Sequence, residues 1–578
     1  MWGPESRAKA LEILNTLYGD AQGGGVLARI EAETARHRPA LNRQRRHGLT
    51  ERDTVLITYG NTLTAPGMQP LATLAEFLDS WVGDAVGLVH LLPIFPYSSD
   101  DGFSVIDYRQ IDPALGDWSD VARVGEHYGL VLDLVLNHCS RSHAWFQGYL
   151  RGDAKTRDYF IEADPNDPRL TLVTRPRSSP LLTPVDVHEG GRYWVWTTFS
   201  ADQVDLNFAN PDVLLEMIDL LLFYATQGAR IIRLDAVAYL WKELGTACIS
   251  LEQTHAVVRL LRLVMDTAAP GVQLLTETNV PQSENLSYFG NGDEANLIYQ
   301  FSLPPLLLHA LVCGRTHALT EWASTLPGPP PRATYLNFTA SHDGVGLRPL
   351  EGLIDDEERD ELLRRMRERG GYVSTRSMPD GRDAPYELNI SYYSAMDAGD
   401  GEDAHMARFL LAQTVALSLR GVPALYIHIL LATPNDTAGV ERSGHTRAIN
   451  RRRWDYGELQ TLLARPDTPQ GIALREMVRR LRIRGRLPQF HPDAAQQILD
   501  LEEGLFGLLR TSHEGQPLIA LFNFTSETRT VKLPKAVTEL AEEWIDALSD
   551  QEISLARKGT EVPSYACLWL MPEAHAEF

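Results

Sequence analysis

Charged side chains stand at the end of several apolar runs in this sequence, and the clearest case is Ala229–Asp235. Ile231 and Ile232 lie in a nearly continuous apolar run, which is typical of a parallel strand buried on both faces. Arg233 and Asp235 are two residues apart, so a strand would point both side chains to the same face at its carboxyl end. The pair is either a surface ion pair that caps the strand or part of an active site, because active sites of parallel α/β proteins lie at that end.

Three further apolar runs end in a similar way. One ends on His138, one on Glu277 and one on the pair His342-Asp343. The carboxyl ends of parallel strands meet at one face of the sheet, so we expect these groups to converge with the Arg-x-Asp pair. Carboxylates and imidazoles gathered in one place suit general acid–base and covalent catalysis. The sequence therefore predicts an active site rather than a surface ion pair.

Eight short apolar runs, alternating with amphipathic helical stretches, must position these groups. Eight strands that alternate with helices predict an α/β protein, a (β/α)₈ TIM barrel rather than an open doubly wound sheet. The runs are Val55–Tyr59, Val86–Pro93, Leu130–Leu136, Ala229–Asp235, Val272–Glu277, Asn296–Phe301, Thr334–Ser341 and Pro423–Ile429.

Two intervals between these runs are too long for a simple crossover. About ninety residues separate the third run from the fourth, and structureless loops of that length are rare, so we expect an inserted domain after strand three. After strand seven, the charged helix Asp355–Arg369 and the polar loop Ser374–Asn389 are expected to form a lid over the barrel mouth. Short alternating strands beyond about residue 495, such as Leu505–Thr511, predict a C-terminal antiparallel β domain. The expected divisions are a helical extension at 1–50, the barrel at 51–138, 211–344 and 406–494, the inserted domain at 139–210, the lid at 345–405 and the C-terminal domain at 495–578.

The composition limits the partners and the compartment. Lys and Arg total 54 against 76 Asp and Glu, a formal charge of -22, which disfavours binding to nucleic acid or to an anionic membrane. The basic run Arg43–His47 is accordingly expected to be a solvated helix face. The four cysteines form no CxxC pair, no secretory signal begins the chain, and no apolar run approaches the ~20 residues that cross a bilayer. We therefore expect a cytoplasmic protein without a zinc or disulfide framework.

The strand-end groups, in their order and spacing, resemble the motifs of the α-amylase family of retaining glycoside hydrolases and transglucosidases. Five motifs occur in register over most of the chain, which makes the resemblance specific. The resemblance implies an enzyme that breaks an α-glucosidic bond through an oxocarbenium-like state. The matching segments are Asp133-Leu134-Val135-Leu136-Asn137-His138, Gln203-Val204-Asp205-Leu206-Asn207, Arg233-Leu234-Asp235, Thr276-Glu277-Thr278 and Ser341-His342-Asp343.

The same resemblance implies roles for individual residues. Asp235 would be the nucleophile that forms a covalent glucosyl-enzyme, and Glu277 would be the general acid that protonates the leaving oxygen. Asp343 would bind sugar hydroxyls and stabilise the distorted transition state. The remaining groups would be Arg233, which keeps the nucleophile ionised, and His138 and His342, which donate hydrogen bonds to the glucosyl ring unless they are buried structural histidines.

Two further segments resemble the sucrose-phosphorylase subgroup of this family, namely Pro93–Phe103 and Gly444–Arg451. By this resemblance Asp100 binds glucosyl hydroxyls, Phe103 makes an apolar wall, and Arg447 pairs with Asp100 around the far end of the glucose. Closing off that end leaves room for one glucosyl unit. We therefore expect an exo-acting enzyme on small glucosides rather than a starch-cleaving one.

The segments Val173–Arg177, Thr197–Ser200 and Thr276–Pro281 resemble the branch of this subgroup that phosphorolyses glucosylglycerate. The implied partners are this small glucoside and inorganic phosphate, and the implied products are α-D-glucose 1-phosphate and D-glycerate. Phosphate and the glycerate carboxylate both need cations, which arginine supplies bidentately, although a surface salt bridge is the alternative for each arginine. The candidates are Arg175, Arg177, Arg376 and Arg382, with Tyr386 and Asn389 as residues that choose between acceptor and phosphate.

No cofactor and no metal are expected. The amylase family often carries calcium near the inserted domain, with ligands that include the equivalents of Asn137 and Asp205, but this chain has no Asp-rich calcium loop.

Sucrose phosphorylase, sucrose 6'-phosphate phosphorylase and an exo-acting α-glucoside hydrolase remain alternatives, because they share the three carboxylates and differ in the acceptor. A non-catalytic amylase-like protein should have lost a carboxylate, and all three are present. The sequence does not reveal the oligomeric state.

Overall fold

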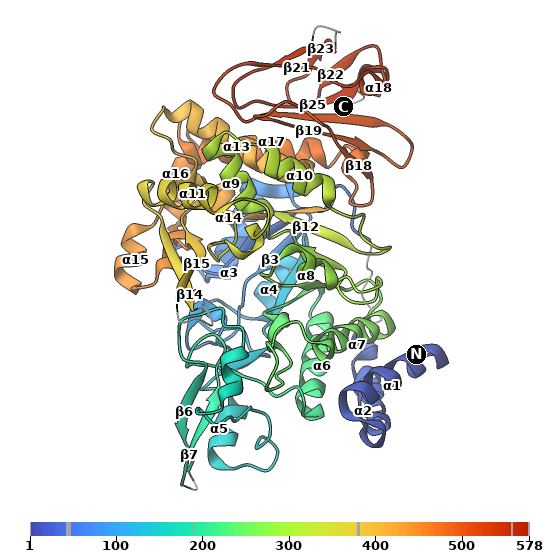
Figure 1. Ribbon diagram of the computed structural model, residues 1–578, viewed down its shortest axis with the longest axis vertical. Coiled ribbons are helices and arrows are strands. Elements are labelled where there is room, and N and C mark those ends of the chain that lie inside the picture. Colours follow the sequence, from blue (N-terminus) through green and yellow to red (C-terminus); the bar gives the residue numbers. More distant parts are fainter. Residues whose placement is uncertain (1, 42–47, 189, 378–381, 556–558, 576–578) are drawn as a thin grey trace.

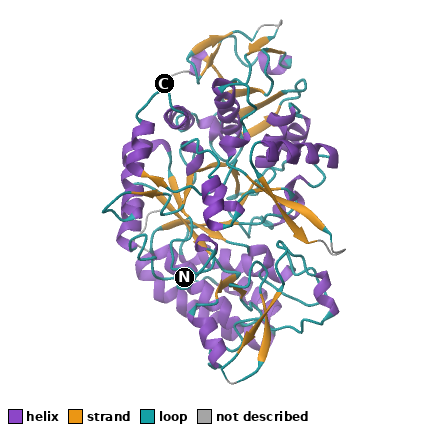
Figure 2. Cartoon of the chain, turned by 90° about the vertical axis from the view of Figure 1, so that its left-hand side faces the viewer, coloured by secondary structure: helices purple, strands orange, loops and turns teal. Residues whose placement is uncertain are grey.

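A closed parallel barrel forms the centre of the molecule in the computed structural model, and helices surround it (Figures 1 and 2). The structure describes residues 2–41, 48–188, 190–377, 382–555 and 559–575. The eight predicted runs are the eight barrel strands, which confirms the predicted (β/α)₈ fold. In the order in which they pair around the barrel they are β1 (Val55–Thr58), β16 (Val422–Tyr426), β12 (Thr334–Phe338), β11 (Leu297–Tyr299), β10 (Gln273–Thr276), β9 (Ala229–Leu234), β4 (Gly129–Leu134) and β3 (Leu88–Leu91).

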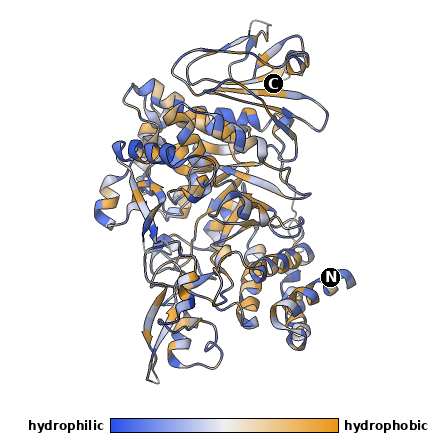
Figure 3. Ribbon diagram, in the orientation of Figure 1, coloured by the Kyte–Doolittle hydropathy of each residue, from blue (hydrophilic) through white to orange (hydrophobic). Residues whose placement is uncertain are grey.

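The barrel strands form because their side chains are apolar on both faces, and nearly every residue in them is buried. The helices that follow them bury their apolar residues, as in α6 and α7, and Figure 3 shows apolar and hydrophilic residues alternating along these helices. The helical segments around the barrel are α3 (Pro70–Phe77), η1 (Leu78–Val82), η2 (Gly83–Ala85), η3 (Asp100–Gly102), α4 (Trp118–Gly125), α6 (Pro211–Thr226), η5 (Val237–Tyr239), α7 (Glu252–Ala268), α8 (Gln282–Ser287), α9 (Leu303–Cys313), α10 (His317–Thr325), α12 (Tyr392–Ala395), α13 (Glu402–Ser418), α14 (Ile427–Leu430), α15 (Thr437–Ser443), η7 (Thr446–Asn450), α16 (Tyr456–Leu463), α17 (Pro469–Arg484) and η8 (Pro488–Phe490). A short pair, β2 (Leu63–Thr64) and β17 (Trp454–Asp455), joins two loops.

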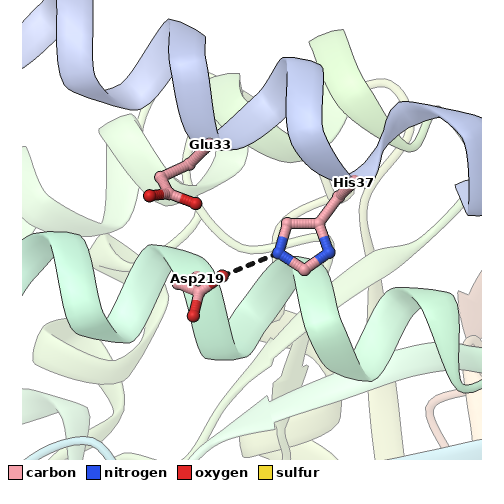
Figure 4. A group of neighbouring side chains, drawn as sticks. All are labelled: Glu33, His37 and Asp219. Atoms are coloured by element: carbon pink, nitrogen blue, oxygen red, sulfur yellow. Dashed lines mark hydrogen bonds and ion pairs between the residues drawn. The ribbon is translucent and has the colours of Figure 1, made fainter.

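The N-terminal extension consists of α1 (Pro4–Tyr18) and α2 (Asp20–Leu41), which pack on α7 and α6. Asp219 of α6 fastens α2: it accepts a hydrogen bond from His37 at 2.7 Å and pairs with Arg36 and Arg109 (Figure 4). Glu33 completes a group of three possible metal ligands with His37 and Asp219. The two guanidinium groups already neutralise Asp219, so this cluster is a docking contact between helices and not a cation site. The basic run at 43–47 lies outside the described residues.

The inserted domain lies beside the barrel mouth, in teal at the lower left of Figure 1. Its β5 and β8 pair antiparallel, so that His138 lies opposite Asp205, and its β6 and β7 form a hairpin. The pairing of β5 with β8 returns the chain to the end of β4. The elements are β5 (His138–Ser140), α5 (Ala144–Arg151), η4 (Pro168–Leu172), β6 (Leu182–Asp186), β7 (Arg192–Trp196) and β8 (Gln203–Asp205).

The lid contains more regular structure than the sequence suggested. The expected charged helix is α11 (Asp356–Glu368), which is hydrophilic along most of its length (Figure 3). The expected polar loop is instead an antiparallel hairpin of β14 (Tyr372–Ser377) and β15 (Asp383–Asn389), and β13 (Val345–Gly346) adds a third strand. This segment lacks the alternating apolar pattern that identifies a strand in a sequence, and the expectation of a loop was wrong. The short helix η6 (Arg348–Leu350) follows β13.

The C-terminal domain is a six-stranded sheet, at the top of Figure 1 in red, with a separate two-stranded pair. The antiparallel neighbours β19 and β20 match the predicted strands. Within the described residues, no helix combines the length and the apolar character that a bilayer span requires. The elements are β18 (Ala495–Ile498), β19 (Leu505–Thr511), β20 (Pro517–Asn523), β21 (Arg529–Val531), α18 (Lys535–Thr538), β22 (Trp544–Asp546), β23 (Gln551–Ile553), β24 (Thr560–Val562), β25 (Cys567–Pro572) and η9 (Glu573–His575).

Candidate active site

Arg233 stands in a buried chain of charges at the carboxyl ends of β4 and β9. Its Nη1 donates to Asp235 Oδ1 at 2.7 Å and to Asp133 Oδ1 at 2.5 Å. His90 of β3 donates through Nε2 to the other Asp133 oxygen at 2.7 Å, and all four side chains are buried. Burial opposes ionisation of Asp133, but Arg233 and His90 outweigh it and lower its pKa to about 2. Arg233 therefore contacts the ionised carboxylate of Asp133 on one side and Asp235 on the other.

Asp235 and Glu277 lie together where the neighbouring strands β9 and β10 end. The backbone N–H of Ala236, which follows Asp235 at φ 51°, donates to Glu277 Oε2 at 3.0 Å. Burial raises the pKa of Asp235 to about 7 against the pull of Arg233. Burial, aided by the charges of Asp235 and Asp343, likewise raises the pKa of Glu277 to about 7. The hydrogen bond from the charged Arg233 favours the ionised form of Asp235 more than the neutral Ala236 N–H favours that of Glu277.

Asp343, after β12, is the third carboxylate. Burial opposes its ionisation, but Arg447, His342 and Arg451 hold its pKa far below the usual range. Arg447 pairs with Asp343 through Nη1 and donates from Nε and Nη2 to the two oxygens of Glu387 at 3.0 and 2.6 Å. Glu387 belongs to β15 and is buried. Arg447 thus ties the lid to the barrel across the mouth of the site.

The structure does not pair Arg447 with Asp100 as the sequence suggested. Arg451 takes that place: its Nη1 lies 3.9 Å from Asp100 and 2.7 Å from Asp101. Arg447 instead binds Glu387 of the lid in a bidentate pair, while it lines the same cavity as Asp100. Asp100 and Asp101 both have positive φ, 53° and 46°, a strained conformation that is typical of functional sites.

Phe103 forms an apolar wall, as expected, and two histidines support it. Its ring stacks on His342 with 4.7 Å between centroids and an interplanar angle of 6°. Its carbonyl accepts from His138 Nε2 at 2.9 Å, so the donor of His138 positions Phe103 in this structure. Burial lowers the pKa of His342 to about 3, so this ring is neutral at physiological pH.

These groups enclose a cavity of about 60 Å³ at the carboxyl ends of the barrel strands. A larger cavity of about 570 Å³ shares Asp100, Arg177 and Arg447 with it. The structure thus brings the three carboxylates together with every expected glucose-binding residue except Arg233, which lies beneath Asp235. The lining residues of the small cavity are Asp100, Phe103, His138, Arg177, Phe199, Gln203, Asp235, Ala236, Glu277, Asn279, His342, Asp343, Tyr386 and Arg447.

The expected anion-binding residues lie in different places. Arg177 and Tyr386 line the small cavity, and the Arg177 guanidinium lies 5.9 Å from the centre of the Tyr386 ring. Asn389 instead donates to Ser374 at 2.8 Å within the lid hairpin. Arg376 is largely buried and donates to Glu351 at 3.0 Å. Two further arginines do not line the small cavity: they are Arg175, which is half-buried, and Arg382, which is exposed on the hairpin.

The residues at the calcium position of the amylase family do not fit a metal ion here. Lys242 Nζ lies 2.7 Å from Asp205 Oδ2 and 2.8 Å from Asn137 Oδ1, and it is buried with them. Asp205 also accepts from the backbone and hydroxyl of Thr198 at 2.8 and 2.6 Å. An ammonium group thus already supplies the positive charge that these oxygens need.

Sequence reasoning missed several residues of this site. Gln203, Phe199 and Asn279 line the cavity and lie within the segments that carried the family resemblance, which was the signal available for them. His90 and Glu387 gave no such signal. His90 is one polar residue inside a barrel strand, and Glu387 lies in a segment expected to be a loop.

Comparisons with known proteins agree with this geometry. The family described as the catalytic domain of alpha amylase matches residues 84–320. Two relatives named glucosylglycerate phosphorylase are similar over most of their length. The protein of Allomeiothermus silvanus is 46% identical over 87% of this chain and 90% of its own. The protein of Spirochaeta thermophila is 42% identical over 99% of this chain and 97% of its own length.

Among solved structures, sucrose 6F-phosphate phosphorylase from Thermoanaerobacter thermosaccharolyticum superposes with a TM-score of 0.73 and 25% identity. The match covers 83% of this chain and 96% of that one. The chain belongs to the α-amylase family, in the group of phosphorylases that includes these relatives.

Proposed function

We propose that this protein is a retaining disaccharide phosphorylase. It converts 2-O-α-D-glucosylglycerate and phosphate into α-D-glucose 1-phosphate and D-glycerate. The observation that carries the proposal is the convergence of Asp235, Glu277 and Asp343 around one small cavity that Arg177 also lines. The similarity over nearly the full length to relatives named glucosylglycerate phosphorylase supports the choice of substrate.

In the first step an Asp235 oxygen attacks the anomeric carbon of the glucosyl unit. The bond from that carbon to the glycerate oxygen breaks, and Glu277 gives its proton to that oxygen. The hydrogen bond from Arg233 favours Asp235 as the carboxylate, and the raised pKa of Glu277 lets this group carry the proton that it donates. Asp343 and the wall made by Phe103 and His342 hold the glucosyl ring while positive charge develops on it.

In the second step phosphate takes the place of glycerate. One of its oxygens attacks the anomeric carbon from the side that glycerate left, the bond to Asp235 breaks, and Glu277 takes a proton from phosphate. Two displacements retain the anomeric configuration, and the enzyme returns to its starting protonation state. Glycerate and phosphate must therefore use the same anion-binding region beside Glu277, in turn.

The test is release of glucose 1-phosphate, measured with and without phosphate on glucosylglycerate, sucrose and sucrose 6'-phosphate. Phosphate-dependent product from glucosylglycerate alone is the expected result. Product from a sucrose donor instead would identify a sucrose or sucrose 6'-phosphate phosphorylase. Free glucose formed without phosphate would identify an exo-acting hydrolase, with the three-carboxylate chemistry unchanged.

We also propose a cytoplasmic location, since all four cysteines are free.

A further inference from the structure

The lid presents two arginines whose side chains have buried N–H groups without partners. The Nε atoms of Arg348 and Arg376 are buried and have no hydrogen-bond partner among the described residues. Buried donors of this kind are rare in folded proteins because leaving one unpaired is costly. Arg376 makes one bond, to Glu351, and the described part of the chain offers the Arg348 side chain no carboxylate within 4 Å.

The three-stranded lid sheet places both arginines around Tyr386. The central strand β15 carries Tyr386, whose carbonyl accepts from the backbone N–H of Leu347 at 2.9 Å, next to Arg348. On the other side, β14 pairs with β15 so that Arg376 lies opposite Ala384. Tyr386 itself lines the catalytic cavity, so both arginines lie on segments that flank a strand of the cavity wall, one layer behind the lining residues.

The segment that carries Arg348 also touches the cavity directly. A Cβ at Gly346 would lie 2.7–3.1 Å from the side-chain atoms of Asn279, so β13 packs against this cavity residue without a side chain between them. Arg348 follows two residues later. This side of the cavity is the Glu277 side, where the leaving group departs and phosphate enters.

We propose that Arg348 and Arg376 form a two-arginine clamp that binds the oxyanion of the acceptor: the carboxylate of glycerate in one direction and phosphate in the other. The inference rests on the proposed phosphorylase function. Planar guanidinium groups bind carboxylates and phosphates in a fork, which would satisfy the unpaired N–H groups. A neutral acceptor such as fructose has no group for this clamp, so Arg348 is a specificity-determining residue.

The electrostatics of the lid agree with this placement. Burial lowers the pKa of Arg376, and the neighbouring positive charge of Arg348 lowers it further, so the two cations repel each other. Burial raises the pKa of Tyr239, which follows β9, and the positive charge of Arg348 opposes that rise. An anion bound between the arginines would relieve their repulsion.

The experiment compares Arg348→Gln and Arg376→Gln with Arg367→Gln, which removes an exposed arginine from the lid helix. KM is measured for phosphate in phosphorolysis and for D-glycerate in synthesis from glucose 1-phosphate. We expect each clamp variant to raise at least one of these KM values tenfold or more, and Arg348→Lys to recover part of the loss. The control variant should match the wild type. A raised KM for phosphate shows that phosphate occupies the clamp, and a raised KM for D-glycerate shows the same for the glycerate carboxylate.

Hydrolysis of α-glucosyl fluoride by the same variants separates the clamp from the catalytic core. This donor has no anionic acceptor group to bind, so its rate should fall by a much smaller factor than the loss with phosphate or glycerate. Clamp variants that match Arg367→Gln in both KM values, while the wild type is an active glucosylglycerate phosphorylase, would overturn the clamp. A wild type that does not use glucosylglycerate would instead overturn the proposed function.

Discussion

Two buried carboxyl groups of the site, Asp235 and Glu277, differ in the hydrogen bond that each accepts. Burial raises the pKa of both Asp235 and Glu277 to about 7. Arg233 donates to Asp235, whereas Glu277 accepts from a neutral backbone N–H. A charged donor stabilises a carboxylate more than a neutral one, so these hydrogen bonds favour the ionised form of Asp235, the proposed nucleophile, over that of Glu277, the proposed general acid. Environment alone separates the two roles.

Asp235→Asn should abolish phosphorolysis, by at least about four orders of magnitude, because the amide is a poor nucleophile and no covalent intermediate forms. The fold should persist, since Asn has nearly the same shape. Initial rates of glucose 1-phosphate release and a thermal unfolding curve check both statements. Asp186→Asn, at a side chain that is 80% exposed on β6, is the matched control. Substantial residual activity in a pure preparation would remove Asp235 as the nucleophile.

Glu277→Gln should make the protein more stable at pH 8 than the wild type. The folded-state pKa of about 7 exceeds the ordinary 4.5, so this carboxyl group stabilises the fold below pH 4.5 and loses that contribution as the pH rises through 7. The difference is about 3 kcal/mol at most. Tm measured at pH 5 and pH 8 should fall less for this variant than for the wild type. Glu368→Gln, on the exposed face of α11, is the control, and its Tm should fall between pH 5 and pH 8 as much as that of the wild type. The same fall in Tm for Glu277→Gln would contradict the raised pKa of Glu277.

At the scale of elements, buried ion pairs fasten the two insertions to the barrel. Arg447, from the short helix η7, bridges Asp343 of the barrel and Glu387 of the lid. Lys242, after β9, bridges Asn137 and Asp205 at the junction with the inserted domain. Removing one partner of a buried pair leaves an uncompensated charge, which costs more than the pair itself contributes.

Glu387→Gln should weaken lid closure. Arg447 would lose the charge of its bidentate partner, and the lid strand β15 would be held less firmly over the cavity. We expect KM for the glucosyl donor to rise about tenfold, equivalent to about 1.4 kcal/mol, with a smaller change in kcat. Steady-state kinetics check this. Glu357→Gln, exposed on the same lid, is the control, and equal KM values for both variants would show that the Glu387 pair does not hold the lid.

Lys242→Met should destabilise the protein by about 3–5 kcal/mol, because Asp205 would keep a buried charge without its partner. Added calcium should restore part of the lost Tm, since the oxygens of Asp205 and Asn137 would become free to bind it. Thermal unfolding with and without calcium measures both effects. Lys155→Met removes a lysine that is 69% exposed and should change little. An unchanged Tm for Lys242→Met would show that the ammonium is not needed there.

At the scale of the whole molecule, two buried arginines hold the base of the barrel, and one of them, Arg510, joins it to the C-terminal sheet. Neither has a carboxylate within 4 Å among the described residues. Arg510 of β19 donates to the carbonyls of Ser418 and His491 at 3.0 and 2.9 Å. Arg484 of α17 donates to the Leu417 carbonyl at 2.9 Å. Burial lowers the pKa of both arginines, because it disfavours the charged form. The carbonyl groups that accept their hydrogen bonds stabilise that charge in place of water.

Arg510→Met should lower Tm by several degrees, because two or more buried carbonyls lose their donor at a cost of about 1–3 kcal/mol each. KM and kcat should stay unchanged, since the contact lies at the base of the barrel, away from the cavity. Differential scanning calorimetry and standard kinetics test this, with the exposed Lys535→Met as the control. A Tm equal to that of the control would mean that the sheet is docked by its apolar contacts alone.

The sequence by itself determined the barrel and the three carboxylates. A parallel strand that is buried on both faces produces a continuous apolar run, so all eight strands could be read locally. The residue that ends such a run lies at the mouth of the barrel, whatever structure the insertions adopt. Asp235, Glu277 and Asp343 were predictable for that reason.

Only the tertiary structure decided what surrounds these carboxylates. Glu387 binds Arg447, and Arg451 lies near Asp100, because segments that are distant in sequence meet at the mouth of the barrel. The strands that carry Arg376 and precede Arg348 flank the same lid strand, β15. Polar side chains on such strands follow no period that a sequence reveals, so the hairpin looked like a loop. Which charges become partners depends on where separate segments dock, and docking is set by contacts that are not local.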